Sequence, residues 1–416
     1  MNRNTLEVQF TDFKPALETS EAIEEAQRCI NCYDAPCIKA CPTGINIPQF
    51  INRIGNGHAK GAAKTILDSN ILGLSCAQSC PVEVLCEGAC VYHELNKKPI
   101  AIGKLQRFAV EYAYDNKIEF YKAGPATGKR VALIGAGPAS LACAHELRKY
   151  GHEAIIYEKS DVVGGLNTTG IAPYKMKAQV SLREIEQVTR LGVRIEYGKE
   201  LGRNIDLKTL VKDHDAVFLG MGLGPDSRLD IPGAALARVY GAVDFIAKIK
   251  TAAASELEWL KKVQSALVIG GGNTALDACR ELKWLKIPQV IVSYRKDEKS
   301  MSGYEHEYKW ARQEGVDFKF HTTPTAIAPE NDRLVATLNH GNEKIDLVVD
   351  LVLFATGQSK LDKLLGGLTI DSKTGRTSDP KVFAGGDLAN GGKEVVNAVA
   401  EGKRAALAIH EGFTHG

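Results

Sequence analysis

The sequence predicts an α/β protein in which a helical N-terminal part precedes two domains built on parallel sheets. The first observation is a strand, glycine turn, helix and second strand over residues 131–158, the beginning of a doubly wound domain. The second is the return of the same succession over residues 265–295. The third is the segment 29–110, where short helical patterns surround closely spaced cysteines. The chain therefore divides into one helical part and two α/β parts.

Length and charge narrow the class of protein further. The 416 residues suffice for two or three domains, and 52 basic against 50 acidic residues leave a net charge of +2. So balanced a charge gives no general attraction to nucleic acid or anionic lipid. Residues 1–10 lack the apolar core of a signal peptide, and no run approaches about 18 apolar residues. We therefore expect a cytoplasmic protein that binds neither nucleic acid nor membranes.

Eight of the ten cysteines lie between Cys29 and Cys90. They form two groups, C-x2-C-x4-C-x3-C-P at residues 29–42 and C-x3-C-P-x4-C-x3-C at residues 76–90. Crowded thiols in a chain without a secretion signal indicate metal rather than disulfides. A last Cys followed by Pro ends the bacterial ferredoxin motif, whereas zinc sites favour two C-x2-C pairs. The cysteines therefore predict two [4Fe-4S] clusters, with zinc as the simpler alternative.

The spacing leaves two ways to assign the cysteines to clusters. In the local assignment, each group of four holds its own cluster. In the crossed assignment, the second cluster needs a fourth ligand besides its three cysteines, and the two sets are Cys29, Cys32, Cys37 and Cys90, and Cys41, Cys80 and Cys86. Spacing alone does not choose between these assignments.

The first glycine turn, Gly135-Ala136-Gly137, predicts a dinucleotide site. The glycines allow a tight turn and close approach of a pyrophosphate at the helix N-terminus, and Glu158 ends the second strand, where an acid binds ribose hydroxyls. Gly164-Gly165 after this acid, and Ala384–Asp387 ahead of a C-terminal helix, are typical of proteins that bind FAD. The candidate FAD residues are Gly135, Gly137, Pro138, Ala139, Ser140, Glu158, Gly165, Leu166, Gly386, Asp387 and Val396.

The second turn, Gly270-Gly271-Gly272, predicts a nicotinamide nucleotide site. No acid follows its second strand; Arg295 and Lys296 stand there instead. A basic residue at this place can pair with a 2′-phosphate, which favours NADP over NAD, although the two could also be a solvated charge pair. The candidate NAD(P) residues are Gly270, Gly272, Asn273, Thr274, Arg295, Lys296, Ala355, Thr356 and Gly357.

The order of the motifs predicts a nicotinamide domain inserted within a split FAD domain. We expect an α-helical domain with two [4Fe-4S] clusters over residues 1–123, the FAD domain over 124–246 and 359–416, and the NAD(P) domain over 247–358. A flavin exchanges two electrons with a nicotinamide and single electrons with an iron–sulfur cluster, so it belongs between them. Hydride transfer between stacked cofactors needs no acid or base from the chain, so we name no catalytic residue.

The whole chain resembles the amino-terminal half of dihydropyrimidine dehydrogenase, above all the bacterial enzymes in which this half is a separate subunit. The resemblance rests on CINCYDAPCIKACP at residues 29–42, CPVEVLCEGAC at 80–90, IGKLQRF at 102–108, the turn at 135–140 and FAGGD at 383–387. It implies the crossed cluster assignment, with Gln106 as the fourth ligand of the second cluster. It also implies that Lys175 contacts FAD, where the family has an arginine, and it leaves Cys76 without a cluster.

The resemblance implies a partner as well, because the family's pyrimidine site lies in an FMN-binding barrel and this chain contains none. We expect electron exchange with NAD(P)H, FAD and two clusters here, and reduction of uracil or thymine in an FMN subunit of a hetero-oligomer. The small subunit of glutamate synthase is built on the same plan and is the main alternative, together with a stand-alone NAD(P)H:acceptor oxidoreductase. Gln106 favours the pyrimidine family, because the glutamate synthase subunit tends to have an acid at that position.

Overall fold

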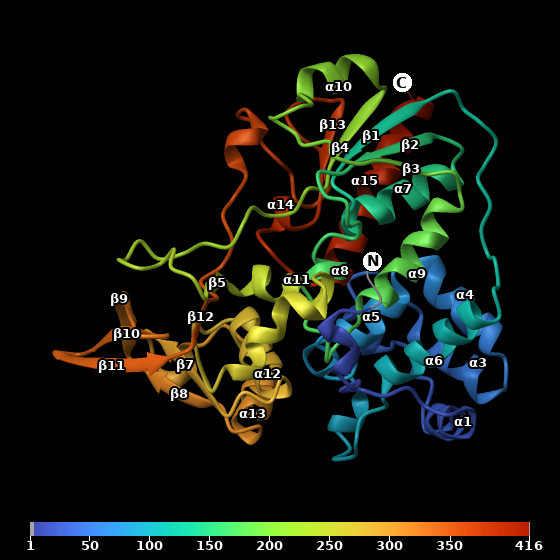
Figure 1. Ribbon diagram of the computed structural model, residues 1–416. Helices are drawn as coiled ribbons and strands as arrows, with labels where there is room; N and C mark the ends of the chain where they lie inside the picture. The colour runs from blue at the N-terminus through green and yellow to red at the C-terminus, as the bar shows by residue number, and fades with distance from the viewer. Residues whose placement is uncertain (1–3, 416) are drawn as a thin grey trace. The chain divides into compact units, whose positions relative to one another are not determined.

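The computed structural model describes residues 4–415, which form two compact units (Figure 1). Unit 1 comprises the chain up to Asp12, Thr169–Lys177 and Gly224–Ser359. Unit 2 comprises Phe13–Thr168, Ala178–Leu223 and Lys360 to the C-terminus. Each unit therefore draws on segments that are far apart in the sequence.

Unit 2 begins with a helical layer around the cysteines. The hydrophobic residues of α3, Ile47, Phe50, Ile51 and Ile54, recur with helical spacing and are buried, and Asn46 caps the helix by accepting from Gln49 N at 3.2 Å. The sequence predicted a helix over 102–115, and α6 has those bounds. The helices are α1 (Thr19–Gln27), α2 (Pro36–Lys39), α3 (Ile47–Gly55), α4 (Ala59–Ser69), α5 (Gly73–Ser79) and α6 (Ile102–Asp115), with 3-10 turns at Leu6–Gln9 in unit 1 and at Val82–Val84 and Val91–His93 here.

The rest of unit 2 is a parallel sheet in the order β13-β4-β1-β2-β3. Strand β13 comes from the C-terminal segment and pairs with β4, which completes a sheet begun some 250 residues earlier in the chain. Helices α7 and α15 pack together on one side of this sheet, and α10 covers the other (Figure 1). The elements are β1 (Arg130–Ile134), α7 (Pro138–Lys149), β2 (Glu153–Tyr157), α8 (Leu166–Thr169), α9 (Ala178–Thr189), β3 (Arg194–Glu196), α10 (Leu207–Asp213), β4 (Ala216–Leu219), η6 (Asp362–Leu365), β13 (Val382–Ala384), α14 (Asp387–Asn390) and α15 (Val395–His415).

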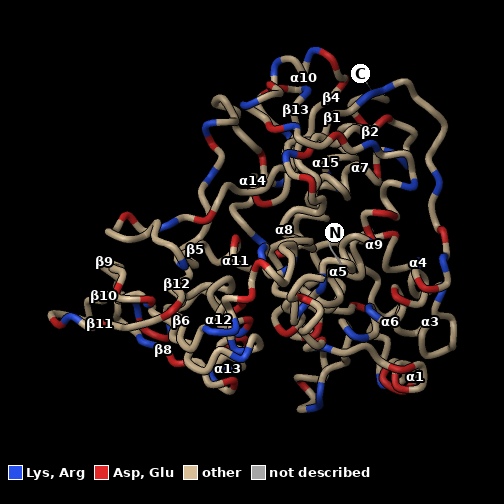
Figure 2. The backbone as a smooth tube through the Cα atoms, viewed as in Figure 1, with Lys and Arg blue, Asp and Glu red and all other residues tan. Residues whose placement is uncertain are grey.

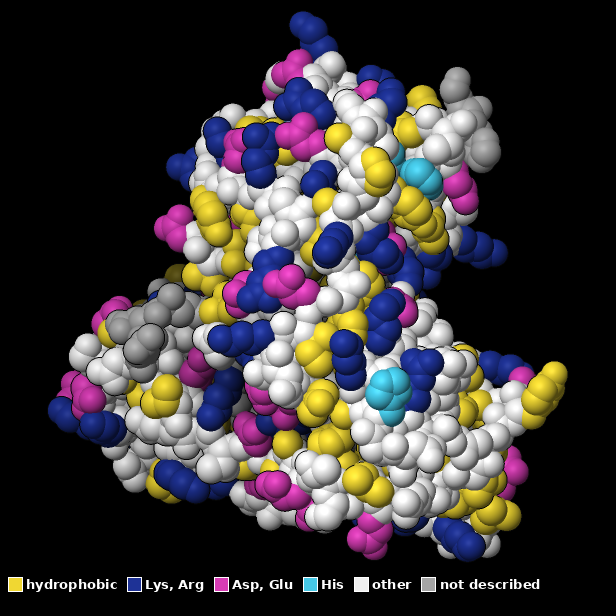
Figure 3. Space-filling model, turned by 90° about the vertical axis from the view of Figure 1, so that its right-hand side faces the viewer, with side chains coloured by type: hydrophobic (Ala, Val, Ile, Leu, Met, Phe, Trp, Pro, Cys, Tyr) yellow, Lys and Arg dark blue, Asp and Glu magenta, His cyan; other side chains and the backbone are white. Residues whose placement is uncertain are grey.

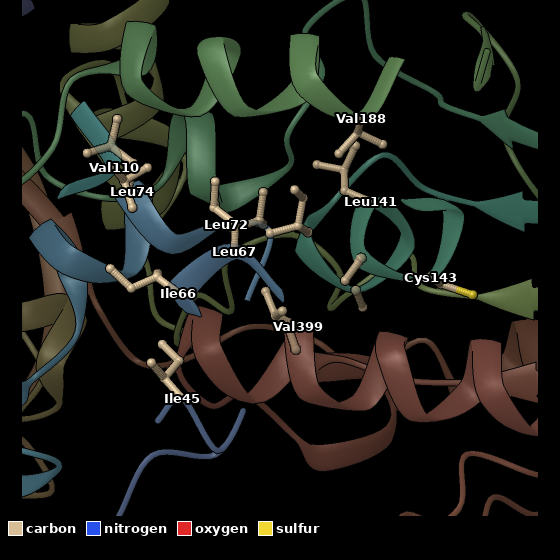
Figure 4. Packing of buried hydrophobic residues seen from close by; sticks show 14 of the residues in the cluster. Ile45, Ile66, Leu67, Leu72, Leu74, Val110, Leu141, Cys143, Val188 and Val399 are labelled. Carbon is tan, nitrogen blue, oxygen red and sulfur yellow. The ribbon is translucent and has the colours of Figure 1, made fainter. Parts of the chain in front are cut away.

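One hydrophobic core runs through both layers of unit 2. Leu67 and Leu72 from the helical layer belong to the same buried cluster as Leu141 on α7 and Val399 on α15 (Figure 4). Val188 on α9 belongs to the same cluster. Because apolar burial stabilises at about 25 cal/mol per Å², separating the layers would expose these side chains to water at a large cost. The cysteine-bearing helices and the first glycine turn are thus parts of one body.

Unit 1 contains a second parallel sheet, in the order β5-β12-β6-β7-β8. The apolar run at 346–357 is divided at Asp350, whose carboxylate accepts from the backbone N–H groups of Gln264 at 2.8 Å and Ser265 at 2.9 Å. The part before Asp350 joins an antiparallel sheet, β9-β10-β11, that the sequence had not revealed. The elements are β5 (Val239–Gly241), α11 (Ala242–Thr251), η4 (Ala254–Lys262), β6 (Ser265–Ile269), α12 (Asn273–Trp284), β7 (Gln289–Tyr294), η5 (Glu298–Ser300), α13 (Glu305–Gln313), β8 (Asp317–Phe320), β9 (Thr322–Glu330), β10 (Arg333–His340), β11 (Glu343–Val349) and β12 (Leu351–Phe354).

The predicted nicotinamide domain over 247–358 lies within the segment Gly224–Ser359 of unit 1, and its bounds stay a prediction. The last of the three segments of unit 1 begins at Gly224, and it includes β5, which pairs with β12, and α11, which follows β5. The turn Leu6–Gln9 packs against α11, and Ala254 N donates to Asn4 O at 2.8 Å. Residues 169–177 are held here as well, since Lys250 Nζ donates to the carbonyls of Ile171 and Met176, each at 2.8 Å. These contacts join residues 4–9 and 169–177 to α11 and to the residue Ala254 that follows it, although the segments lie far apart in the sequence.

The charged residues of both signs are dispersed along the chain (Figure 2). On the face drawn in Figure 3, hydrophobic side chains are likewise scattered among basic and acidic ones. Within residues 4–415, none of the helices has the length and apolarity needed to cross a bilayer.

Candidate functional site

Four cysteine side chains from both sequence groups line one pocket of the helical layer. They are Cys29, Cys32, Cys37 and Cys90, and Cys41 is not among the lining residues. The remaining walls are apolar, apart from Tyr92, whose hydroxyl donates to Arg28 O. Thiols are therefore the main ligand chemistry that this pocket offers. The other lining residues are Ile30, Ala35, Pro36, Ile47, Pro48, Ile51, Val91, Tyr92, Ile100 and Ile102.

The electrostatics of this pocket fit a positively charged metal centre. Burial, together with charge repulsion from the neighbouring Cys29, Cys90 and Cys32, raises the pKa of Cys37 to about 11. Burial also raises the pKa of Cys29, with Cys32 and Cys90 contributing. Four thiolates could not share this apolar space without a cation, because their mutual repulsion adds to the desolvation penalty. A cluster of ferric and ferrous ions supplies that charge.

The described side chains do not form a site for a single metal ion. Among the residues that the structure describes, no three or more His, Cys, Asp or Glu side chains stand close enough together to hold one ion. Tetrahedral zinc with Zn–S bonds of about 2.3 Å would need four converging sulfurs. A [4Fe-4S] cluster attaches each sulfur to a different iron, so its ligands line a larger space. The arrangement of the four thiols fits the cluster.

The remaining cysteines form a second group beside the first. Cys86 lies near Cys41 and Cys37, and burial is the main cause that raises its pKa. Cys80 lies near Cys76 and Cys86; the hydrogen bond with Cys76 is the main cause that raises its pKa, followed by burial. Glu394, just before α15, also acts on Cys80. This acidic residue is one that sequence reasoning missed, and no spacing signal pointed to it. The second cysteine group thus faces the end of unit 2 at which α15 begins.

Gln106 lies on the buried side of α6 and is held in a fixed orientation. Its Nε2 donates to the carbonyl of Gly73, the first residue of α5, at 2.7 Å. Because one end of the side-chain amide is used as a donor, the carbonyl oxygen Oε1 is left as the acceptor end. A buried amide oxygen in this position can serve as a metal ligand.

The first glycine turn of unit 2 has the close backbone approach that a dinucleotide requires. A Cβ on Gly165 would lie 3.2 Å from the Cα of Gly137, and Gly165 has φ +54°, which favours glycine. Gly164 N donates to Ala136 O at 3.0 Å, so the two glycine segments are fixed against each other. Gly137 is the N-cap of α7, whose first N–H groups are then free to bind phosphate. The cradle fits a pyrophosphate.

Glu158 lies where the sequence predicted an acid, at the end of β2. Its two carboxylate oxygens accept from Ala136 N at 2.7 Å and Ser160 N at 2.8 Å. These bonds fix the carboxylate beside the fingerprint turn and leave a lone pair on each oxygen for ribose hydroxyls.

The C-terminal part of the site comes from the segment after β13. Gly386 N donates to Glu401 Oε2 at 2.7 Å, which ties the turn to α15. Burial raises the pKa of Asp387, and Glu401 adds to this effect, while the N–H of Lys393 opposes it. Val396, in the first turn of α15, is buried. The remaining candidate FAD residues of unit 2 (Pro138, Ala139, Ser140 and Leu166) lie on α7 or α8 next to the two turns.

The second glycine turn belongs to unit 1. A Cβ on Gly270 would meet the carbonyl of Ala355 at 2.3 Å, so the turn passes close over the end of β12. Tyr304 N donates to Asn273 Oδ1 at 2.9 Å, which folds the segment after β7 back toward the start of α12. Arg295 and Lys296 follow β7 and are exposed. The predicted residues Gly270, Gly272, Asn273, Thr274, Ala355, Thr356 and Gly357 all border the carboxyl ends of β6 and β12.

Lys175 is part of unit 1 and lies in a buried ion-pair network. Its Nζ is 2.6 Å from Asp277 Oδ1 and 2.6 Å from Glu307 Oε1. Burial lowers the lysine pKa, but the two carboxylates outweigh it and raise the pKa above the ordinary value. The Tyr174 hydroxyl donates to Asp277 at 2.9 Å. The ammonium group is thus engaged by two carboxylates, and its contact with FAD stays a prediction.

The fold and the site together define a class: a flavoprotein with a pyridine nucleotide domain and an N-terminal iron–sulfur domain. Residues 6–118 match the family model "Dihydropyrimidine dehydrogenase domain II, 4Fe-4S cluster". Residues 129–402 match the model for pyridine nucleotide-disulphide oxidoreductase. The chain belongs to the pyridine nucleotide-disulphide oxidoreductase family and is an NAD(P)H-dependent flavin and iron–sulfur oxidoreductase with FAD, NAD(P) and iron–sulfur clusters as its cofactors.

Two relatives are similar over nearly their whole length. The NAD-dependent dihydropyrimidine dehydrogenase subunit PreT of Escherichia coli K12 is 36% identical over 404 residues, covering 96% of each chain. The glutamate synthase [NADPH] small chain of the same strain is 31% identical over 443 residues, covering 97% of this chain and 93% of the relative. These likenesses confirm the predicted family.

Solved structures show the fold of the two α/β parts. FprA of Mycobacterium tuberculosis in complex with NADPH has a TM-score of 0.56 and 18% identity, over 70% of this chain and 85% of that chain. Thioredoxin reductase of T. acidophilum has a TM-score of 0.56 and 16% identity, over 68% of this chain and 98% of that chain. The predicted α/β fold class is thereby confirmed.

Proposed function

We propose that this chain is the electron-input subunit of a dihydropyrimidine dehydrogenase. It exchanges electrons with NAD(P)H, and a partner subunit that contains FMN reduces uracil or thymine to the 5,6-dihydropyrimidine. FAD supplies the change from two-electron to one-electron chemistry, because nicotinamides carry hydride and [4Fe-4S] clusters carry single electrons. The relative named as a dihydropyrimidine dehydrogenase subunit supports this reading over the full length of the chain.

The observation that carries the proposal is the shared core of unit 2. The helices around the cysteines, and the α7 and α15 helices that border the FAD turns, pack into one hydrophobic cluster. Residues that hold a flavin and residues that hold clusters are therefore kept at constant separation, as electron transfer between them requires. A mere binding module would need no such arrangement.

For the clusters we propose the crossed set of ligands. The pocket that joins Cys90 with three cysteines of the first group supports Cys29, Cys32, Cys37 and Cys90 as ligands of one cluster. The proximity of Cys41, Cys86 and Cys80, and the fixed amide of Gln106, support the second set. The proposed second set is Cys41, Cys80, Cys86 and Gln106.

The α/β residues bind and orient the nucleotides. In unit 2, the N–H groups at the start of α7 bind the FAD pyrophosphate, Glu158 binds its ribose, and Asp387 orients the flavin end. In unit 1, the start of α12 binds the NAD(P) pyrophosphate, and Arg295 selects for a 2′-phosphate. The proposed roles follow from helix N-termini as anion sites and from the hydrogen-bonding capacity of buried carboxylates.

The small subunit of glutamate synthase is the second candidate. The 31% identity to that protein over 97% of this chain favours it, and its plan of nucleotide and cysteine motifs is shared. Gln106, held against Gly73 rather than replaced by an acid, favours the pyrimidine enzyme.

The first test is to identify the partner. The tagged chain is purified without oxygen from its native host, and co-purifying proteins and their cofactors are identified. A partner with FMN, and NAD(P)H oxidation that depends on uracil, is the expected result. A much larger partner with a glutamine amidotransferase domain would overturn the proposal in favour of glutamate synthase.

The second test separates hydride transfer from electron export. Cys32→Ala should leave NAD(P)H oxidation by an artificial dye largely intact and abolish turnover with the partner. Cys143→Ala is the matched control, because Cys143 is a fully buried thiol on α7 outside both cysteine groups. An equal loss of both activities in Cys32→Ala alone would refute the proposed order of electron flow.

A further inference from the structure

Glu184 has a fully buried carboxyl group that belongs to neither nucleotide turn nor either cysteine group. It lies on α9 with no exposed surface. Three donors converge on it from the start of α5: Leu74 N at 2.6 Å, Ser75 N at 3.1 Å, and the Ser75 hydroxyl. The N-cap residue of α5, Leu72, offers no side-chain cap. Glu184 therefore caps a helix that lies more than 100 residues away in the sequence.

Helix α5 is the element on which the second cysteine group depends. Cys80 directly follows this helix, and its N–H donates to Cys76 O at 3.0 Å. Gln106 is anchored at the other end, through its bond to Gly73 O. Two of the four proposed ligands of the second cluster thus take their position from the one helix that Glu184 holds.

The same carboxylate is linked to the flavin-binding turn by a chain of buried hydrogen bonds. Ser75 Oγ, which donates to Glu184, accepts from Asn167 Nδ2 at 2.9 Å. Asn167 also donates to Ser181 Oγ at 3.0 Å, and that hydroxyl is 2.7 Å from Thr168 Oγ1. The two hydroxyl oxygens leave no room for a side chain on Gly164, since a Cβ there would lie 1.8 Å from Thr168 Oγ1. The turn that carries Gly165 therefore rests on this network.

Burying a carboxylate is costly unless its partners satisfy it, and replacing such a network with apolar side chains often leaves a protein equally stable. Hydrogen bonds are directional, so a polar network of this kind fixes the relative orientation of the elements that it joins more strictly than apolar packing does. Leu72 of the helical layer and Val188 of α9 belong to one buried hydrophobic cluster (Figure 4), so apolar packing also stabilises this part of unit 2. The network adds orientation between two cofactor-binding elements.

We propose that Glu184 is a positioning residue for electron transfer, which fixes α5, and with it Gln106 and Cys80, relative to the flavin-binding turn at Gly164-Gly165. The inference rests on the proposed function, because it presumes that the second cysteine group holds a cluster. Glu184 touches no cofactor in this assignment and acts through α5.

The test compares Glu184→Ala and Glu184→Gln with the wild-type chain in the anaerobic holoprotein. Iron and FAD content, the EPR spectrum of the reduced clusters and the rate of cluster reduction after mixing with NAD(P)H are measured. Glu186→Gln is the matched control, since Glu186 lies on the same helix but is exposed and pairs with Arg190. Glu184→Gln keeps the volume and an acceptor oxygen, so it guards against a failure of Glu184→Ala to fold.

In Glu184→Ala we expect flavin reduction at the wild-type rate and an altered EPR spectrum for one cluster. Cluster reduction should slow by up to about a hundredfold, the rate cost of a misplacement of about 1 Å. Glu184→Gln should fall between this variant and the wild type. Wild-type EPR spectra and cluster reduction rates in both variants would overturn the inference. A parallel loss of FAD and iron in both variants would also overturn it, because Glu184 would then be needed only for folding.

Different experimental results would show that the proposed function itself is wrong. If wild-type protein with full FAD holds no second cluster, or if Gln106→Ala leaves both clusters spectroscopically unchanged, the ligand set is wrong, and the inference falls with it. If the wild type holds both clusters and both Glu184 variants have wild-type EPR spectra and cluster reduction rates, the proposed function stands and the inference alone is refuted.

Discussion

Lys175→Met should destabilise unit 1 through the loss of a buried cation. In the native protein, the lysine Nζ lies 2.6 Å from Asp277 and 2.6 Å from Glu307, and the Lys175 side chain is only 14% exposed. Removal of the lysine leaves two buried carboxylates facing each other, and removing one member of a buried ion pair typically costs about 3–5 kcal/mol. For a unit of this size, about 2–4 °C of melting temperature corresponds to 1 kcal/mol, so a decrease of about 6–20 °C is expected.

The assay is thermal unfolding followed by tryptophan fluorescence. The chain has three tryptophans, Trp259, Trp284 and Trp310, and all of them lie in unit 1. Trp284 stacks on Tyr174 with ring centroids 5.6 Å apart, close to the altered residue. The signal therefore reports the unfolding of unit 1 without a contribution from unit 2.

The pH dependence has a definite sign. Burial raises the pKa of Glu307, and loss of the lysine should raise it further. A carboxyl group whose folded-state pKa exceeds its unfolded value binds protons more tightly in the native state, so stability is gained as the pH falls and lost as it rises. The penalty of Lys175→Met should therefore shrink toward pH 4.5, and Glu307→Gln in the same chain should recover much of it at pH 7.

Lys309→Met is the control, because Lys309 pairs with Glu305 on the exposed surface of α13, where an ion pair is worth about 0–1 kcal/mol. A change of less than about 2 °C in Lys175→Met would refute the reasoning, since it corresponds to at most about 1 kcal/mol. Loss of FAD without loss of stability, not recovered by Glu307→Gln, would instead support the flavin contact that the resemblance implies for Lys175.

The other predictions concern the cofactors. Cys90→Ala should lower the iron content by one cluster and Cys76→Ala should not, as measured by iron analysis; equal losses would contradict the crossed ligand set. Gly165→Ala should lower the FAD content after purification, because its Cβ would lie 3.2 Å from Gly137 Cα and its φ of +54° disfavours alanine; a full FAD complement would argue against the cradle. Arg295→Ala should raise KM for NADPH about tenfold relative to NADH, equivalent to about 1.4 kcal/mol; equal changes for both nucleotides would leave Arg295 no part in selecting a 2′-phosphate.

Local patterns in the sequence were sufficient to predict much of the fold. The glycine turns lie between strands and helices because tight turns and phosphate cradles require glycine at fixed spacing, and α6 has its predicted bounds because its apolar residues recur with helical period. The antiparallel sheet β9-β10-β11 was not predicted, because in β10 the consecutive apolar residues Leu334, Val335 and Ala336 conceal the alternation of buried and half-buried positions along the strand.

Long-range contacts could not be read from spacing. The pairing of Cys90 with the first cysteine group depends on how the helical layer folds back on itself, and both cluster assignments were compatible with the sequence. Glu184 carries no motif, since its role comes from meeting a helix more than 100 residues away. The FAD contact of Lys175 was implied by the family resemblance, while its ion-pair partners Asp277 and Glu307 come from α12 and α13.

The interlaced segments of the two units set the order in which this protein can be assembled. The turn Leu6–Gln9 leaves the ribosome well before its neighbour α11, which begins at Ala242. Synthesis at about 5–20 residues per second separates the two by roughly 10–50 s. All eight clustered cysteines emerge during that interval, whereas β13 and α15 are made after α11. Iron can therefore reach the helical layer before β13 is made, whereas the sheet that borders the flavin turns closes only after β13 has been made, so FAD is enclosed after the clusters can form.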